Sequence, residues 1–120
     1  MNLKPLGATE VMVPEVGLGT WNYQGDPQVI HMSLEMGGYL IDSAENYHAE
    51  VHVGNAVRGR RDVYFIATKV AGEHLRHRDV LRVVDASLKG LETDHIDSTR
   101  STGPSRAYPW TRPCGPWESW

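Results

Sequence analysis

The chain has 120 residues and a net charge of -3 at neutral pH, with histidines counted as neutral. This length suits one ordinary domain. Basic residues neither dominate nor cluster beyond the short run 58–61, so we expect no nucleic-acid partner. The first residues lack the apolar core of a signal peptide, and no apolar stretch is long enough to span a membrane. Together with a single cysteine, Cys114, these features predict a cytoplasmic protein with no membrane partner.

Strand-like and helix-like segments alternate along the first 97 residues. This strict alternation predicts an α/β fold in which helical crossovers connect parallel strands. The start of the first helix is the clearest local signal, because Asp26 is a good N-cap and Pro27 suits the first helical position. We predict, in chain order, hairpin strands at 3–6 and 11–13, a strand at 16–20, a helix from 27 to 37, a strand at 39–42, a helix at 49–57, a strand at 63–68, a helix at 79–91 and the beginning of a strand at 95–97.

The composition changes after Asp97. Residues 98–120 contain no Leu, Ile, Val or Met, but they hold four of the seven prolines and three of the four tryptophans. This segment has neither strand nor helix periodicity, so we expect it not to continue the strand–helix pattern. We therefore divide the chain into a domain at 1–97 and a disordered, non-native tail at 98–120.

Three residues at predicted strand ends can carry out acid–base chemistry. Asp42 closes one strand, Tyr47 lies five positions later in the following loop, and Lys69 follows the next strand. The carboxyl ends of neighbouring parallel strands lie at one edge of a sheet, so these side chains are expected to meet. An ammonium group beside a phenol stabilises the phenolate and can lower the phenol's pKa by about 1–3 units. The trio therefore predicts a proton donor for carbonyl reduction.

The same residues belong to four motifs that resemble the aldo-keto reductase family. The motifs occur in the family's order and span nearly all of residues 1–97. They are Gly17-Leu18-Gly19-Thr20-Trp21; Ile41-Asp42-Ser43-Ala44 with Tyr47, Glu50 and Val53-Gly54; Ile66-Ala67-Thr68-Lys69-Val70; and Ser87-Leu88 with Leu91, Asp94 and Ile96-Asp97.

The resemblance implies a (β/α)8 TIM barrel that opens with an N-terminal hairpin. Here only about three strand–helix units are present, so the barrel would not close and its open strand edges would favour aggregation. The resemblance also implies an NADPH-dependent oxidoreductase that reduces small aldehydes and ketones to alcohols. The residues that it assigns are catalytic Asp42, Tyr47 and Lys69; cofactor-binding Gly19, Thr20, Trp21 and Asp42; and substrate-binding Trp21, Tyr47 and His48.

Other readings of these residues stay open. Lys69 could form a Schiff base in a barrel aldolase, although this leaves Tyr47 unexplained. His48 and His52 lie four positions apart, a spacing that would share one face of a helix, but the residue order of zinc proteases is absent and we expect no metal site. The chain could also be a reductase-like binding or regulatory protein, or a small interaction module that uses its aromatic tail.

The resemblance ends abruptly at Asp97. The family continues with Leu-Tyr-x-x-His, whose histidine completes the catalytic group, whereas this chain continues with Ser98-Thr99-Arg100-Ser101-Thr102. Deletion of one base from CTC TAC CAG GTC CAC TGG CCC, which encodes Leu-Tyr-Gln-Val-His-Trp-Pro, yields codons for residues 98–104 as they stand. We therefore expect a frameshift after Asp97 and an inactive fragment.

Overall fold

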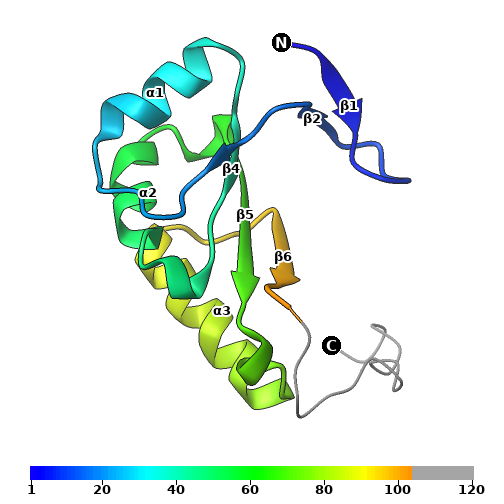
Figure 1. Ribbon diagram of the computed structural model, residues 1–120, viewed down its shortest axis with the longest axis vertical. Helices are drawn as coiled ribbons and strands as arrows, with labels where there is room; N and C mark the ends of the chain where they lie inside the picture. The colour runs from blue at the N-terminus through cyan, green and yellow to red at the C-terminus, as the bar shows by residue number, and fades with distance from the viewer. Residues whose placement is uncertain (104–120) are drawn as a thin grey trace.

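The computed structural model describes residues 1–103, in which a small hairpin precedes a four-stranded parallel sheet and three α-helices (Figure 1). No helix in this part of the chain is both long and apolar enough to cross a membrane. The elements are β1 (Leu3–Pro5), β2 (Met12–Pro14), β3 (Leu18–Gly19), α1 (Pro27–Glu35), β4 (Leu40–Asp42), η1 (Glu45–Tyr47), α2 (Glu50–Val57), η2 (Arg61–Val63), β5 (Phe65–Val70), η3 (Gly72–His74), α3 (His77–Leu91) and β6 (Ser98–Ser101).

The larger sheet has the strand order β3-β4-β5-β6, and every neighbouring pair is parallel. Each helix connects one strand to the next, as the alternating sequence pattern predicts. The register aligns Ile41 of β4 with Ile66 of β5, and Asp42 with Ala67. Within residues 1–103 the sheet does not close, because neither β3 nor β6 has a second neighbouring strand.

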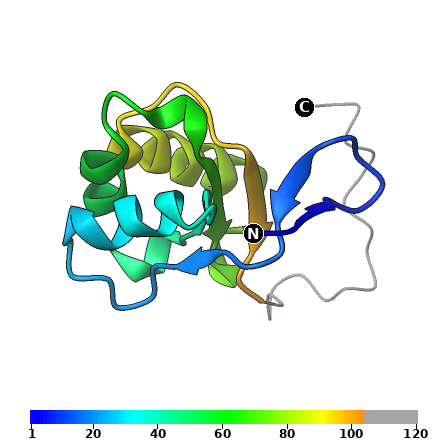
Figure 2. The same ribbon diagram turned by 90° about the horizontal axis from the view of Figure 1, so that it is seen from above.

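The three helices cover one face of this sheet, and the β1–β2 hairpin lies on its other side (Figure 2). The core lies between the sheet and the helices. Ile30, Ile41, Val53, Ile66 and Leu91 are almost fully buried there and come from both layers. Side chains alternate along a strand, so Ile41 and Ile66 face the helices while Asp42 and Lys69 face the uncovered side. The packing that stabilises the sheet therefore also aims the polar residues away from the core.

Local signals start α1 where the sequence predicts, although the helix ends at Glu35 and not at Gly37. The Asp26 side chain accepts a hydrogen bond from the backbone N–H of Gln28 at 3.0 Å, and Pro27 occupies the first turn. After the helix, Gly37 adopts a left-handed φ of 84°, which glycine tolerates better than other residues, and its N–H donates to Leu34 O. The chain then enters β4 at Leu40.

The expectation that the strand pattern stops at Asp97 is wrong for the next four residues. Ser98–Ser101 form β6, which pairs in parallel with β5 from Ala67↔Ser98 to Val70↔Ser101. A strand that is buried on both faces of a sheet needs an apolar sequence. Strand β6 lies at the edge of the sheet and its middle residues are exposed, so polar residues are tolerated there. Backbone pairing with β5 is thus sufficient to extend the sheet. The predicted tail from residue 104 onward, including Trp110, Trp117 and Trp120, lies outside the described residues.

Several element boundaries also differ from the predictions. The strand predicted at 63–68 lies at Phe65–Val70, because Arg61–Val63 form the 3-10 turn η2 before it. The strand predicted at 16–20 shortens to Leu18–Gly19. Helix α3 begins at His77 and not at Asp79.

Candidate active site

The predicted strand-end carboxylate and amine form an ion pair. Lys69 Nζ donates to Asp42 Oδ2 at 2.5 Å and to the backbone carbonyl of Ser43 at 2.9 Å. The side chain of Lys69 is only 13% exposed and that of Asp42 is 32% exposed. A largely buried ammonium group requires such partners, because burial without them would favour its neutral form. Asp42 therefore gives the Lys69 ammonium a partner of opposite charge and holds it in one position.

Tyr47 completes the trio from the 3-10 turn η1. Its hydroxyl oxygen lies 3.5 Å from Lys69 Nζ, which also sits 4.8 Å from the centre of the phenol ring. The positive charge is thus close to both the oxygen and the π face of Tyr47. The structure brings together Asp42, Tyr47 and Lys69 as the sequence predicts, and their catalytic roles stay a prediction.

The trio is joined by a fourth residue, a charged one that sequence reasoning missed. Arg100 of β6 donates to Asp42 Oδ1, so both carboxylate oxygens are bound by cations. The register aligns Arg100 with Lys69, which places both on the same face of the sheet. Position 100 could have been found only by extending the strand pattern beyond Asp97.

Position 102 differs from the family pattern. Thr102 stands where the resemblance predicts a histidine, and its backbone N–H donates to Val70 O at 2.9 Å. Its side chain is exposed. A threonine hydroxyl cannot replace an imidazole as a proton donor or acceptor at neutral pH. Within the described residues, the predicted catalytic group is therefore incomplete.

Besides Asp42, the three other residues predicted to bind a cofactor lie beside the trio. Thr20 is buried, and both its N–H and its hydroxyl donate to the carbonyl of Asp42, at 2.9 and 3.0 Å. This double contact fixes the end of β4. Gly19 is exposed, and a Cβ placed there would meet no atom within 4 Å. Trp21 is 63% exposed, with its ring centre 5.9 Å from that of Tyr47.

A hollow of about 490 Å³ opens beside the phenol. It is lined by Trp21, Asn22, Asn46 and Tyr47. Two of the residues predicted to bind substrate, Trp21 and Tyr47, thus face a common space, and the two asparagines are additions that no motif indicated. His48, the third predicted substrate residue, is not in the lining; it is exposed and ends η1 in a left-handed conformation with φ 55°.

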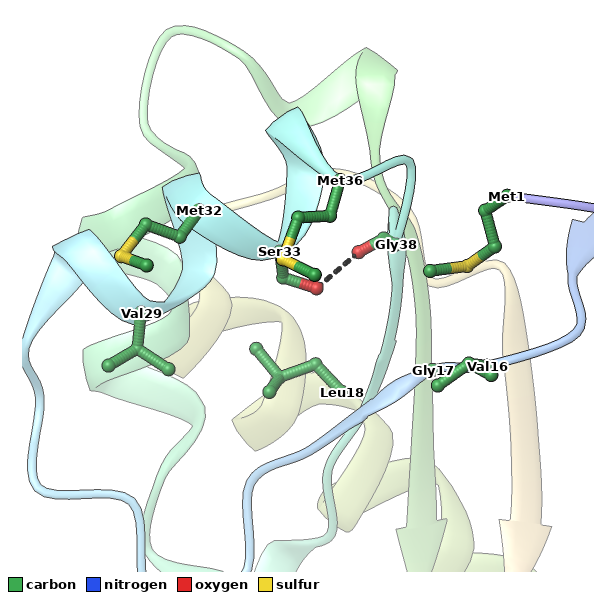
Figure 3. Close-up of a pocket in the computed structure, with 9 residues that line it drawn as sticks. All are labelled: Met1, Val16, Gly17, Leu18, Val29, Met32, Ser33, Met36 and Gly38. Carbon is green, nitrogen blue, oxygen red and sulfur yellow. Dashed lines mark hydrogen bonds between the residues drawn. The ribbon is translucent and has the colours of Figure 1, made fainter.

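A second hollow, of about 350 Å³, lies at the other end of β3, beside α1 (Figure 3). Its lining is almost entirely apolar and includes none of the predicted site residues. The residues are Met1, Val16, Gly17, Leu18, Val29, Met32, Ser33, Met36 and Gly38. This hollow is therefore separate from the group formed by Asp42, Tyr47, Lys69 and Arg100.

The histidines that suggested a metal do not form a ligand group. Residues 1–103 contain no cluster of three or more histidine, cysteine or acidic side chains placed to hold an ion. His52 packs edge-on against Tyr23, with ring centres 6.3 Å apart. A further histidine, His74, lies beside Glu45, with its Nδ1 3.0 Å from both carboxylate oxygens.

Several known proteins are similar to this chain in both sequence and fold. The sequence model of the Aldo/keto reductase family matches residues 15–109, a range that passes Asp97. Methylglyoxal reductase YeaE of Escherichia coli (strain K12) is 34% identical over 99 residues, covering 73% of this chain and 34% of that protein. The 2,5-diketo-D-gluconic acid reductase B of Corynebacterium sp. (strain SHS752001) is 38% identical over 88 residues, covering 69% of this chain and 32% of that protein.

Solved structures of aldo-keto reductases have a similar fold. The thermostable aldo-keto reductase Tm1743, in complex with the inhibitor epalrestat, superimposes with a TM-score of 0.83 at 35% identity, covering 91% of this chain and 45% of that one. An aldo-keto reductase of Klebsiella pneumoniae in complex with NADPH gives a TM-score of 0.67 at 35% identity, covering 78% of this chain and 37% of that one.

The chain spans about a third of the length of the curated relatives that it matches. Its open parallel sheet and its reductase neighbours confirm the predicted fold class, a partial (β/α)8 barrel. The family match, the identities and the shared architecture together show that this chain belongs to the aldo/keto reductase family.

Proposed function

We propose that the site is that of an NADPH-dependent reductase of small aldehydes and ketones. The observation that carries this proposal is the position of the Lys69 ammonium, 2.5 Å from Asp42 Oδ2 and 3.5 Å from the Tyr47 hydroxyl. The partly buried ion pair accounts for the first contact, and proton chemistry at the phenol would account for the second. The methylglyoxal and diketogluconic acid reductases among the relatives support small dicarbonyl compounds as the substrate class.

In this proposal Tyr47 is the general acid. Its hydroxyl donates a proton to the carbonyl oxygen while negative charge develops there, a contribution typically worth about 10²–10⁴-fold in rate. The phenolate that remains is stabilised by the ammonium of Lys69, which Asp42 and the Ser43 carbonyl hold in place. Trp21 forms an apolar wall against which the carbon skeleton of the substrate packs.

The residues at the end of β3 fit a nicotinamide cofactor. The exposed backbone at Gly19 leaves open space where a side chain would stand, and Thr20 rigidly fixes the neighbouring strand end. Gly19, Thr20, Trp21 and Asp42 would border the nicotinamide ring. When bound, NADPH supplies the hydride that reduces the carbonyl carbon.

We also propose that this chain, as it stands, is inactive because its reading frame shifts after Asp97. Thr102 replaces the expected histidine, and one deleted base accounts for residues 98–104. The coding DNA tests this origin directly. If reinsertion of one base after the Asp97 codon does not open a frame that begins Leu-Tyr-Gln-Val-His, the frameshift is wrong.

Activity tests the function itself. The frame-restored protein and the present chain are each assayed for NADPH oxidation with methylglyoxal, alongside Tyr47→Phe in the restored frame. We expect turnover in the restored protein only, and a loss of about 10²-fold or more in Tyr47→Phe with little change in NADPH binding. Absence of turnover in the restored protein would refute the function, and unchanged turnover in Tyr47→Phe would remove the phenol from the mechanism.

A further inference from the structure

Two acidic side chains flank Tyr47 in the sequence, and both bind the segment that carries Lys69. Glu45 lies two positions before Tyr47, at the start of η1, and Glu50 lies three positions after it, at the start of α2. Their partners lie on β5 and the turn that follows it. Tyr47 and Lys69 therefore sit between two points of attachment.

The first attachment is made by Glu45. Its Oε1 accepts from the backbone N–H of Ala71 at 2.5 Å, and both of its oxygens lie 3.0 Å from Nδ1 of His74. The Glu45 side chain is 18% exposed, so these contacts form in a partly desolvated environment. Ala71 follows Lys69 by two residues, so this contact holds the chain just beyond the amine.

The second attachment is made by Glu50. Its Oε1 accepts from the hydroxyl of Thr68 at 2.6 Å, and Thr68 is 1% exposed. Thr68 directly precedes Lys69 in β5. The two acids thus contact the chain on both sides of Lys69, from positions on both sides of Tyr47.

The contact between Tyr47 and Lys69 is itself weak. At 3.5 Å the hydroxyl lies at the outer limit of hydrogen bonding. The turn that carries Tyr47 has little regular structure of its own, since η1 has three residues and ends at left-handed His48. Such a turn needs external anchors to keep a catalytic group within a fraction of an ångström.

We propose that Glu45 and Glu50 are positioning residues that hold the phenol of Tyr47 against the ammonium of Lys69. Charge-assisted hydrogen bonds to a carboxylate are shorter and stronger than neutral ones, which suits these two side chains to this role. For its catalytic consequence the inference rests on the proposed function. The geometry itself can be tested without turnover.

The three lysines of the chain provide the test. Lys4 and Lys89 have side chains that are 69% and 76% exposed, whereas Lys69 is 13% exposed within the cluster. Limited acetylation with acetic anhydride, read by mass spectrometry, gives the labelling rate of Lys69 relative to Lys89 in one molecule. Lys4 serves as a second internal reference.

Glu45→Ala is expected to raise the relative labelling rate of Lys69 by about fivefold or more, because the cluster opens locally while circular dichroism stays unchanged. Glu45→Gln keeps an acceptor for the Ala71 N–H and should restore most of the protection. Glu73→Gln, an exposed acid in η3, is the matched control and should change nothing.

Thr68→Val keeps the shape of the side chain, removes the partner of Glu50, and should also raise the Lys69 rate. Unchanged Lys69 labelling in both Glu45→Ala and Thr68→Val would overturn the inference. Global unfolding of both variants would also overturn it, because Glu45 and Glu50 would then stabilise the whole fold and not specifically the contact between Tyr47 and Lys69. Inactivity of the frame-restored protein would refute only the proposed function and leave these labelling results standing.

Discussion

Arg100 and Asp42, 58 residues apart in the chain, form an ion pair across the uncovered face of the sheet. The contact gives the Asp42 carboxylate a second cation besides Lys69. Within the group formed by Asp42, Lys69 and Arg100, two cations therefore face one carboxylate. Residue 100 lies in the segment that we attribute to a shifted frame, and the restored frame that we propose would encode glutamine there. The second cation would then be a property of the present chain only.

The two ion pairs of Asp42 are expected to differ in their contribution to stability. Arg100 is 56% exposed, so Arg100→Ala should lower the free energy of unfolding by less than about 1 kcal/mol. Asp42→Asn leaves the largely buried Lys69 without its carboxylate and should cost about 1.5–3 kcal/mol. Urea denaturation followed by circular dichroism measures both. Equal losses of unfolding free energy in the two variants would contradict this expectation, because the Arg100–Asp42 pair would then contribute as much as the Lys69–Asp42 pair.

The close packing of α2 against α3 makes Gly54 sensitive to any side chain. A Cβ at this position would lie 2.6 Å from the backbone oxygen of Leu91, so the helices would have to separate. Gly54→Ala should therefore destabilise the fold by about 1–3 kcal/mol. Gly90→Ala is the matched control, because its nearest neighbour would be the Cβ of Glu50 at 3.4 Å. Thermal melting should show a stabilised Gly90→Ala, by about 0.5–1 kcal/mol, since alanine favours helix.

Ser43 is fully buried next to the site. Among the described residues, its Oγ is buried without a hydrogen-bond partner. Ser43→Ala removes this desolvated group and should raise the free energy of unfolding by about 1 kcal/mol. The control is Ser33→Ala, which loses a 2.7 Å hydrogen bond to Gly38 O and should lower it by about 0.5–1.5 kcal/mol. A loss of stability in Ser43→Ala would point to a partner for the hydroxyl.

Tyr64 should make the fold sensitive to alkaline pH. Burial raises the pKa of its phenol above the ordinary value of about 10, and the nearby Arg60 charge opposes this only in part. The folded state therefore holds the proton more tightly than the unfolded state. This contribution is fully present below pH of about 10 and is lost as the pH rises through the folded pKa. Unfolding free energies measured across this range should fall less steeply in Tyr64→Phe, and identical slopes would contradict the assignment.

The sequence by itself determined the family, the alternation of strands and helices, and the trio of Asp42, Tyr47 and Lys69. These features are local: an N-cap, an apolar strand or a residue at a strand end can be recognised from a few neighbouring positions. Parallel strands bring such ends to a single edge, so the encounter of Asp42 with Lys69 followed from topology alone.

Only the tertiary structure decided what surrounds the trio. Strand β6 forms through backbone pairing with β5, which any sequence without proline can provide, so its polar residues gave no signal. The ion pair of Arg100 depends on that pairing. The contacts of Glu45 and Glu50 likewise join segments at least 18 positions apart. Contacts of this kind are set by how strands and helices pack, and they produce no periodic pattern in the sequence.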